Sequence, residues 1–376
     1  MNTNLKKAIG KIHLWIGLSS GIIVFIIAVT GCLYAFQEEI QNITEEYRFV
    51  EKEDKPFLLP SQLEAIAQKE FPKKALHAIK YNGAEKSAEA IFYHYEPTYY
   101  YIVYLNPYSG KVLEKANMEE GFFRFILDGH FYLWLPHDIG QIVVASATLI
   151  FLVLLISGLI LWYPRNKNAT KQRFSFQWKK GTKWKRKNYD LHNITGFYVF
   201  LIALIFAITG LVWGFQWFAY SYYTVIGGEK SLVYEDPVSG KNKSSIEKPV
   251  DKVWTLMQKE YPHAKSIEVH PPENDSTSIA ANANPEEGTY WKTDYRYFDQ
   301  YSLEEKEVNH LFGKYKNAAV SDKLMRMNYD LHTGAVLGLP GKIFAFLISL
   351  LIASLPITGF YIWWGRKNKN KKTVSN

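Results

Sequence analysis

The chain has 376 residues, of which 48% are hydrophobic and 16% aromatic, and its formal net charge is +8. Its single cysteine, Cys32, excludes a disulfide framework within the chain. No Gly-x-Gly-x-x-Gly fingerprint for a flavin or nicotinamide nucleotide occurs, which excludes the common dinucleotide-binding folds.

Four apolar runs are long enough to cross a hydrocarbon core of about 30 Å, which needs about 20 residues. They are residues 12–36, 138–163, 192–218 and 341–364. Most of the positive charge lies in the segments that flank them on one side, residues 1–11, 164–191 and 365–376. These segments hold 18 Lys or Arg residues and one acid, Asp190. The charge therefore predicts membrane topology, with both termini and the loop cytoplasmic in a bacterial inner membrane, and not a nucleic-acid surface.

An alternative exists for the first apolar run. Val29-Thr30-Gly31-Cys32 fits a lipoprotein cleavage box, in which Cys32 would become a lipidated N-terminus. The run continues through Phe36, however, which favours an uncleaved membrane span.

The regions 37–137 and 219–340 are polar, hold most of the acidic residues and are expected outside the membrane. The first predicts a helix at 59–71, strands at 90–95 and 99–105, and a turn that leads into a strand at 111. The second predicts a helix at 250–260 and strands at 266–270, 276–281 and 290–301. Both are expected to be small α+β modules.

The apolar runs form two matched pairs. His13 and His192 are each followed 17 residues later by Thr-Gly, in the first and third runs. Small residues then recur at spacings of three and four on one helical face, where they leave room for a flat cofactor. In the second and fourth runs, a Ser/Thr-Gly pair precedes Trp and Arg at one spacing, and the arginines are Arg165 and Arg366.

A further motif, Arg-x-x-x-Asp-x-His, precedes the second and fourth runs and ends at His130 and His332. So many matches at equal spacing predict two tandem copies of one helix–soluble region–helix unit. Both copies start on the cytoplasmic side, so we expect their pseudo-twofold axis along the membrane normal. The predicted fold class is an α-helical polytopic membrane protein with four transmembrane helices.

The helix at 59–71 followed by Val-Tyr-Leu-Asn-Pro-Tyr-Ser-Gly-Lys-Val-Leu-Glu at 103–114 resembles a PepSY module. Together with the histidine-bearing spans, the chain resembles over nearly its whole length the PepSY-associated transmembrane family, which includes the FoxB-type siderophore reductases. The resemblance implies bound b-type haem and reduction of ferric siderophores at the outer face. The second region departs from the pattern, with Asp-Gln-Tyr-Ser at 299–302 where a turn closed by glycine is expected.

Four of the ten histidines are matched between the copies. His13 and His192 form an inner pair, and His130 and His332 an outer pair. Imidazole is a neutral nitrogen donor suited to iron, and a haem iron takes one axial ligand on each side. Each pair therefore predicts one haem b, held by coordination alone because no Cys-x-x-Cys-His motif occurs. The alternative is that these histidines only form hydrogen bonds at the membrane interface. His137 has no counterpart and is a secondary candidate for the role of His130.

Arg124 and Arg326 precede the outer histidines by six residues. A guanidinium fork matches a carboxylate, so we expect these arginines to bind haem propionates. Contacts with lipid headgroups, or with Asp128 and Asp330, are the alternative.

The predicted function is that of a haem-dependent ferric-siderophore reductase. Electrons would pass through two haems to a ferric siderophore or other ferric chelate outside, where reduction to Fe(II) weakens its binding to oxygen donors. A membrane quinol or a separate reductase would supply the electrons, and no catalytic side chain is assigned beyond the haems. The alternatives are a PepSY-based membrane protein that restrains an extracytoplasmic protease or senses the envelope, and a transporter, although the spans lack buried charged residues for ion coupling.

Overall fold

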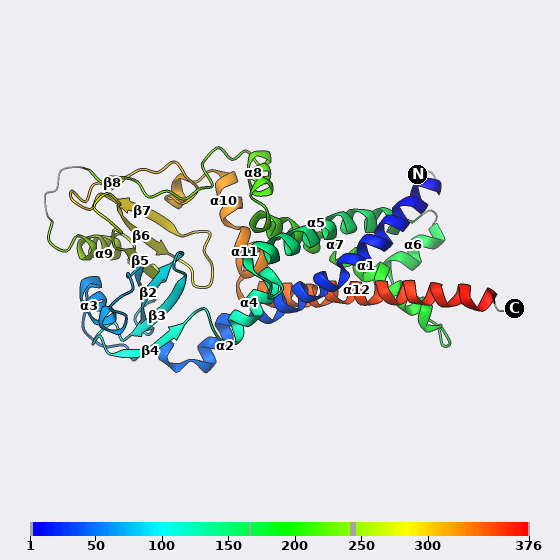
Figure 1. The fold of residues 1–376 in the computed structure, drawn as a ribbon, viewed down its shortest axis with the longest axis horizontal. Coiled ribbons are helices and arrows are strands. Elements are labelled where there is room, and N and C mark those ends of the chain that lie inside the picture. Colours follow the sequence, from blue (N-terminus) through cyan, green and yellow to red (C-terminus); the bar gives the residue numbers. More distant parts are fainter. Residues whose placement is uncertain (1–2, 165–166, 241–245, 375–376) are drawn as a thin grey trace. The chain divides into compact units, whose positions relative to one another are not determined.

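The computed structural model describes residues 3–164, 167–240 and 246–374. The chain forms two compact units (Figure 1). The bundle unit comprises Met1–Phe36, Phe125–Tyr222 and Leu331–Asn376, and the sheet unit comprises Gln37–Arg124 and Tyr223–Asp330. Arg165, one of the two motif arginines, lies outside the described residues.

The bundle unit is built on four long helices. They are α1 (Thr3–Tyr34), α5 (His137–Trp162), α7 (Trp184–Gly214) and α12 (Gly338–Val374). Each contains a stretch long and apolar enough to cross a membrane, as the sequence predicts. Helices α1 and α7 begin well before their apolar runs, because the Lys- and Arg-rich residues ahead of them are good helix formers. Helix α1 continues without a break through Cys32.

The four long helices form a ring in which α1 and α7 each pack against α5 and α12. Small side chains let the backbones approach closely in the middle of the bundle. This core consists of Val24, Ala28, Leu155, Val199, Ala203, Ala207, Ile352 and Ala353. The start of α1, the end of α12 and the short helix α6 (Lys167–Phe174) lie at the same end of the bundle (Figure 1). The three basic segments of the sequence therefore meet at one end.

Short helices flank the long ones. Helices α4 (Phe122–Tyr132), α8 (Gln216–Val225) and α11 (Asn328–Thr333) contain the points at which the chain passes between the two units. A 3-10 turn, η3 (Ala335–Leu337), leads into α12, where Pro340 lies in the first helical turn, a position that tolerates proline. Pro136 caps the start of α5.

The sheet unit contains one antiparallel sheet of eight strands in the order β4-β3-β2-β1-β5-β6-β7-β8. The strands are β1 (Ala78–Tyr81), β2 (Ala88–His94), β3 (Tyr99–Leu105), β4 (Val112–Asn117), β5 (Ser266–His270), β6 (Ile279–Asn284), β7 (Asp294–Phe298) and β8 (Glu305–Lys306). Helix α3 (Pro60–Glu70) precedes the first four strands, and α9 (Pro249–Glu260) precedes the last four. The remaining elements are α2 (Gln37–Thr44), η1 (Glu46–Arg48), η2 (Tyr315–Asn317) and α10 (Val320–Arg326).

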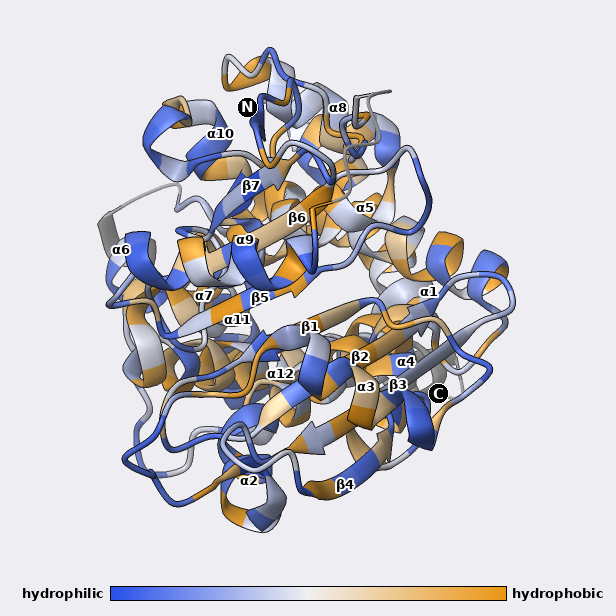
Figure 2. Ribbon diagram, turned by 90° about the vertical axis from the view of Figure 1, so that its left-hand side faces the viewer, coloured by the Kyte–Doolittle hydropathy of each residue, from blue (hydrophilic) through white to orange (hydrophobic). Residues whose placement is uncertain are grey.

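Helices α3 and α9 pack on the same face of this sheet. Both carry hydrophilic and hydrophobic residues (Figure 2), and their apolar sides share one core with the strands. Leu63 and Met257, one from each helix, are fully buried in that core. The core therefore joins the two extramembrane regions into one unit.

The sheet differs in one respect from the expectation of two separate modules. Strands β1 and β5 pair antiparallel, with Lys80 opposite Glu268, so the regions share a continuous sheet. Strand β1 has only four residues and was not predicted. Pairing between strands so far apart in the chain leaves no local sequence pattern. The residues of an edge strand alternate in the same way whether or not another strand pairs with it.

Candidate functional site

The structure brings the four repeat-matched histidines together as two pairs. His13 on α1 faces His192 on α7, with ring centroids 6.5 Å apart and planes at 83°. His130 on α4 faces His332 on α11, with ring centroids 6.1 Å apart and planes at 69°. Each pair takes one ring from each predicted copy of the repeat.

In the first pair, both rings are held through Nδ1. The hydroxyl of Ser157, on α5, lies 2.8 Å from Nδ1 of His13, and that of Thr358, on α12, lies 2.9 Å from Nδ1 of His192. Each hydroxyl also donates its proton to a carbonyl of its own helix, at 3.2 Å for Ser157 and 2.9 Å for Thr358. A hydroxyl has one proton, so it must accept from Nδ1–H. In a neutral ring, Nε2 then carries the free lone pair.

In the second pair, the same logic applies. Nδ1 of His130 donates to the carbonyl of Ile27 at 2.8 Å, and the hydroxyl of Thr30 lies at 3.3 Å. Nδ1 of His332 lies 2.8 Å from the hydroxyl of Thr209, which donates its own proton to a carbonyl of α7. A carbonyl can only accept, so the tautomer of His130 is fixed without reference to the hydroxyl. In the neutral form, all four rings therefore carry the proton on Nδ1 and the free lone pair on Nε2. Histidines that ligate a metal typically have this arrangement.

A glycine follows each of these hydroxyl residues and makes room for the ring. A Cβ atom at Gly31 would lie 3.0 Å from Cε1 of His130, and one at Gly210 would lie 3.5 Å from Cε1 of His332. The corresponding distances are 3.4 Å from Gly158 to His13 and 3.3 Å from Gly359 to His192. The repeated Ser/Thr-Gly motif thus has a physical role, since the hydroxyl orients the imidazole and the glycine leaves space for it.

The separation of the rings tests whether each pair fits one metal ion. Two imidazoles on opposite sides of a metal, with metal–nitrogen bonds of about 2 Å, have ring centres about 6 Å apart. Both observed separations agree with that value. Among the described residues, no group of three or more His, Cys, Asp or Glu side chains is placed to hold a metal ion. A pair of neutral imidazoles is poor at holding a bare ion, but it supplies the two axial ligands that a porphyrin iron needs. The residues present fit haem.

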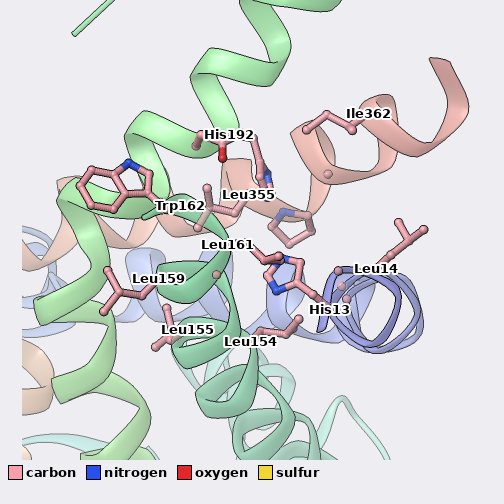
Figure 3. Close-up of a pocket in the computed structure, with 18 of the residues that line it drawn as sticks. His13, Leu14, Leu154, Leu155, Leu159, Leu161, Trp162, His192, Leu355 and Ile362 are labelled. Carbon is pink, nitrogen blue, oxygen red and sulfur yellow. The ribbon is translucent and has the colours of Figure 1, made fainter. Parts of the chain in front are cut away.

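A cavity of about 390 Å³ surrounds the His13–His192 pair, in the size range of about 300–1,000 Å³ typical of ligand pockets. The two imidazoles point toward one another across it, among leucines from α1, α5 and α12 (Figure 3). Six glycines line the walls: Gly10, Gly17, Gly21, Gly158, Gly196 and Gly359. The absence of a side chain at these six positions leaves room between the leucines for a flat, wide molecule.

The His130–His332 pair has an aromatic environment. Trp213 and Phe206, both on α7, lie with ring centroids 5.4 Å and 5.7 Å from that of His332. Phe131 lies 5.7 Å from His130 and 6.5 Å from Trp213. Rings of this kind exclude water and pack against a flat conjugated group.

The two pairs lie toward opposite ends of the bundle. Gly31, which touches His130, follows His13 by 18 residues on α1, and Gly210 follows His192 by the same number on α7. At 1.5 Å per residue the pairs are separated by about 27 Å along the helices, close to the thickness of a hydrocarbon core. The small apolar core described above occupies the space between them.

Arg124 and Arg326 belong to the sheet unit, and each has partners there. Arg124 forms an ion pair with Glu119 at 2.9 Å. Arg326 is 8% exposed, donates to the carbonyls of Gly313 and Thr293, and lies between the rings of Tyr295 and Tyr315. Binding of haem propionates by these arginines stays a prediction.

His137 starts α5, where its ring lies 4.8 Å from that of Tyr132 and 3.3 Å from the carboxylate of Asp138. It is not one of the four paired rings. From the sequence, the Ser/Thr-Gly motifs were identified only as evidence of a repeat, and their contact with the histidines was not predicted. The repeated spacing between these motifs and the histidines could have suggested the contact, because hydroxyl groups at the same level of the membrane as the histidines can orient their rings.

The comparison with known families agrees with the sequence and the structure. The model of the PepSY-associated TM region matches residues 11–366. No curated protein matches the chain. Because that match spans both histidine pairs and all four membrane helices, the chain belongs to the PepSY-associated transmembrane family.

Proposed function

We propose that the protein is a di-haem b oxidoreductase that carries electrons across the inner membrane and reduces a ferric siderophore or other ferric chelate. The observation that carries this proposal is the geometry of the two histidine pairs, with ring centroids 6.5 Å and 6.1 Å apart and every Nδ1 engaged. Haem supplies one-electron chemistry when bound, since its iron alternates between Fe(III) and Fe(II).

The protein's own residues hold and orient the ligands. Ser157 and Thr358 fix the rings of the first pair, and Thr209 with the carbonyl of Ile27 fixes those of the second. Outer-shell hydrogen bonds of this kind raise the basicity of a ligating imidazole and set its orientation. The apolar and aromatic walls keep the dielectric low, which together with the axial ligands tunes the redox potential.

Two tandem copies of one unit account for this arrangement. Helices α1, α4 and α5 correspond to α7, α11 and α12, because each copy contributes one ring and one set of supporting groups to both pairs. The halves of the sheet likewise each consist of a helix followed by four strands, which supports the proposal that both are PepSY-like regions. The proposed axis between the copies passes between the paired rings.

The charge distribution supports the proposed direction. The three basic segments meet at the end of the bundle that carries the His13–His192 pair (Figure 1). By the positive-inside rule this end is cytoplasmic, so the His130–His332 pair is near the outer face and the acceptor is reduced there. A membrane quinol or a separate reductase supplies the electrons.

Cofactor content is the first test. Protein purified from haem-replete cells is expected to show the absorption bands of low-spin b haem, with about two haems per chain by pyridine haemochrome analysis. Acid–acetone should extract all of the haem, because the sequence has no Cys-x-x-Cys-His motif for covalent attachment. A colourless protein would overturn the proposal and favour a binding or regulatory role for the sheet unit.

The direction of electron flow is tested in oriented vesicles. Dithionite-reduced haem in right-side-out vesicles should be reoxidised by an added membrane-impermeant ferric siderophore. The same complex added to inverted vesicles should have little effect. Reoxidation confined to inverted vesicles would place the acceptor on the cytoplasmic face and contradict the proposed direction.

A further inference from the structure

Three basic side chains line the cavity around His13 and His192. They come from three separate helices: Lys6 from α1, Arg173 from α6 and Arg366 from α12. Lys6 precedes His13 by seven residues, which is two helical turns, so both lie on one face of α1. Arg366 follows Gly359, beside the ring of His192, by the same number. The backbone positions of Lys6 and Arg366 therefore lie about two turns beyond the rings, at the basic end of the bundle.

The guanidinium of Arg173 is held in place by neutral groups that also line the cavity. It donates to the side-chain oxygen of Asn193 at 2.7 Å and lies 5.7 Å from the ring of Tyr189. The three basic segments contain one acid, Asp190, and that carboxylate already accepts from Arg186 at 2.9 Å and Trp178 at 3.2 Å. Arg173 is thus oriented by the protein, and the hydrogen bonds described for Asp190 are with other groups. Lys6 donates to the carbonyl of Tyr163 at 3.4 Å, a neutral group that leaves its charge in place.

The opposite side of the same cavity is apolar. Val24, Phe151, Leu155 and Phe200 line it toward the middle of the bundle. A molecule that fills the cavity must therefore be apolar at one edge and anionic at the other. Carboxylates are expensive to bury without a cation, and a guanidinium fork pairs with them strongly.

We infer that Lys6, Arg173 and Arg366 bind the two propionates of a haem ligated by His13 and His192, and so orient its carboxylate edge toward the basic end of the bundle. This inference rests on the proposed function, because it needs haem in this cavity. The three residues belong to the bundle unit. They lie outside the Arg-x-x-x-Asp-x-His motifs, which contain Arg124 and Arg326. The edge of the porphyrin without carboxylates would then face the apolar middle of the bundle, where Val24, Phe151 and Leu155 line the cavity.

The test compares haem with its dimethyl ester, in which both propionates are uncharged. Full-length protein from haem-deficient cells is reconstituted with either compound, and affinity at the His13–His192 site is measured by absorption titration. Haem should bind the wild-type protein at least about tenfold more tightly than the ester, since charge-assisted hydrogen bonds are lost in the ester. In the double variant Arg173→Gln with Arg366→Gln, this preference should largely disappear.

A matched control removes the same charge elsewhere in the basic loop. Lys171→Gln with Lys180→Gln changes two exposed side chains that do not line the cavity, and should keep the wild-type preference. Equal binding of haem and ester to the wild-type protein would overturn the inference and indicate that the mouth serves another anion, such as a lipid phosphate. Failure of both compounds to bind, in wild-type protein and in control, would instead overturn the proposed function.

A second measurement separates propionate binding from a general effect of charge on folding. The midpoint potential of the haem at the His13–His192 site is measured as a function of pH. The signal of this haem is identified as the one that is absent from the His13→Ala variant. Without its cations a propionate takes up a proton more readily, so this potential should vary more steeply with pH in the Arg173→Gln, Arg366→Gln protein than in the control. Identical pH profiles in the two proteins would contradict the inference.

Discussion

The sheet unit and the bundle unit differ in the number of partners that their buried charged and polar side chains have. In the sheet unit, buried charges have several partners each. Arg296 pairs with Glu260 and Glu305, and the carboxylate of Asp299 accepts from three backbone amides and pairs with Lys306. These networks are closed, as buried charges require, and they stabilise the fold.

In the bundle unit, by contrast, each of the four paired histidines is held through Nδ1 by a hydroxyl or a carbonyl, and the second ring nitrogen is the atom that our proposal assigns to the haem iron. A polar group that is held firmly at one atom and presented at the other is typical of a binding site. The difference teaches that burial alone does not mark function in this protein. What distinguishes the four histidines is an orienting contact at Nδ1 that recurs at matched positions of the chain.

The largest expected effect comes from removal of the ligands. His13→Ala and His192→Ala should each lose the same haem, whereas His130→Ala and His332→Ala should each lose the other. In the proposed arrangement both rings of a pair bind one iron, so a double variant within a pair should lose no more haem than either single variant. Haem content and low-temperature spectra of the α band would show this. Arg296→Met is the counterpart in the sheet unit, and should lower thermal stability while both haems remain.

If His137→Ala rather than His130→Ala removes the second haem, the assignment of this ligand is wrong. Loss of both haems from any single histidine variant would show that the two sites depend on each other for folding. The proposed contrast between the bundle unit, which would bind haem, and the sheet unit, whose buried charges stabilise the fold, would then not hold.

The next effect concerns Gly31 and Gly210, two glycines at matched positions whose surroundings differ. A Cβ at Gly31 would lie 3.0 Å from His130, which is too close without movement, whereas at Gly210 the distance to His332 is an ordinary 3.5 Å. Gly31→Ala should therefore weaken haem binding at the second pair or shift its potential, and Gly210→Ala, the matched control, should be tolerated. Redox titration and haem transfer to apomyoglobin measure both. Equal effects of the two substitutions would contradict the close contact at Gly31.

A smaller effect is expected from the supporting hydroxyls of the first pair. Among the described residues, Ser157 is the recorded partner for Nδ1 of His13, whereas His192 contacts the carbonyl of Leu355 as well as Thr358. Ser157→Ala should reduce haem affinity at this site by about tenfold, at the lower end of the range for outer-shell changes. Thr358→Val should reduce it less. An equal or larger loss in Thr358→Val would show that the Leu355 carbonyl does not orient His192.

The smallest effect on haem is expected from Glu268, on strand β5 of the sheet unit. Burial opposes ionisation of this carboxyl, but its hydrogen bond with His270 and the charges of His270, Lys80 and His77 outweigh burial and lower its pKa to about 2. A lowered carboxyl pKa stabilises the fold above the unfolded value, near 4.5, and this contribution is lost as the pH falls from there toward 2.

Glu268→Gln should therefore be less stable than the wild-type protein above about pH 5, by about 2 kcal/mol, with the gap closing on acidification. Thermal unfolding followed by tryptophan fluorescence measures the gap, and the Soret band reports on the haems. A gap that stays constant with pH would mean that the carboxylate charge is not what stabilises the sheet. A change in the Soret band of Glu268→Gln at neutral pH would show that this sheet-unit residue affects the haems, and would contradict the proposed separation of roles between the two units.

Features that depend on local patterns could be predicted from the amino-acid sequence. The four membrane helices follow from the length of the apolar runs, and helices α3 and α9 and strands β3 and β5 lie within about a residue of their predicted bounds. The pairing of the histidine rings was also predictable, because the motifs around His13 and His192, and around His130 and His332, match at equal spacing. Repeated spacing is a one-dimensional signal, and it survives without knowledge of the fold.

The contacts between groups far apart in the sequence became known from the three-dimensional structure. It joined the two extramembrane regions through β1 and β5, placed Arg326 in a closed network of the sheet unit, and assigned Lys6, Arg173 and Arg366 to the cavity of the first pair. It also showed that the Ser/Thr-Gly motifs orient the histidines. Such contacts depend on how helices rotate and pack, which a period along the chain does not specify, because several faces of a membrane helix are equally apolar.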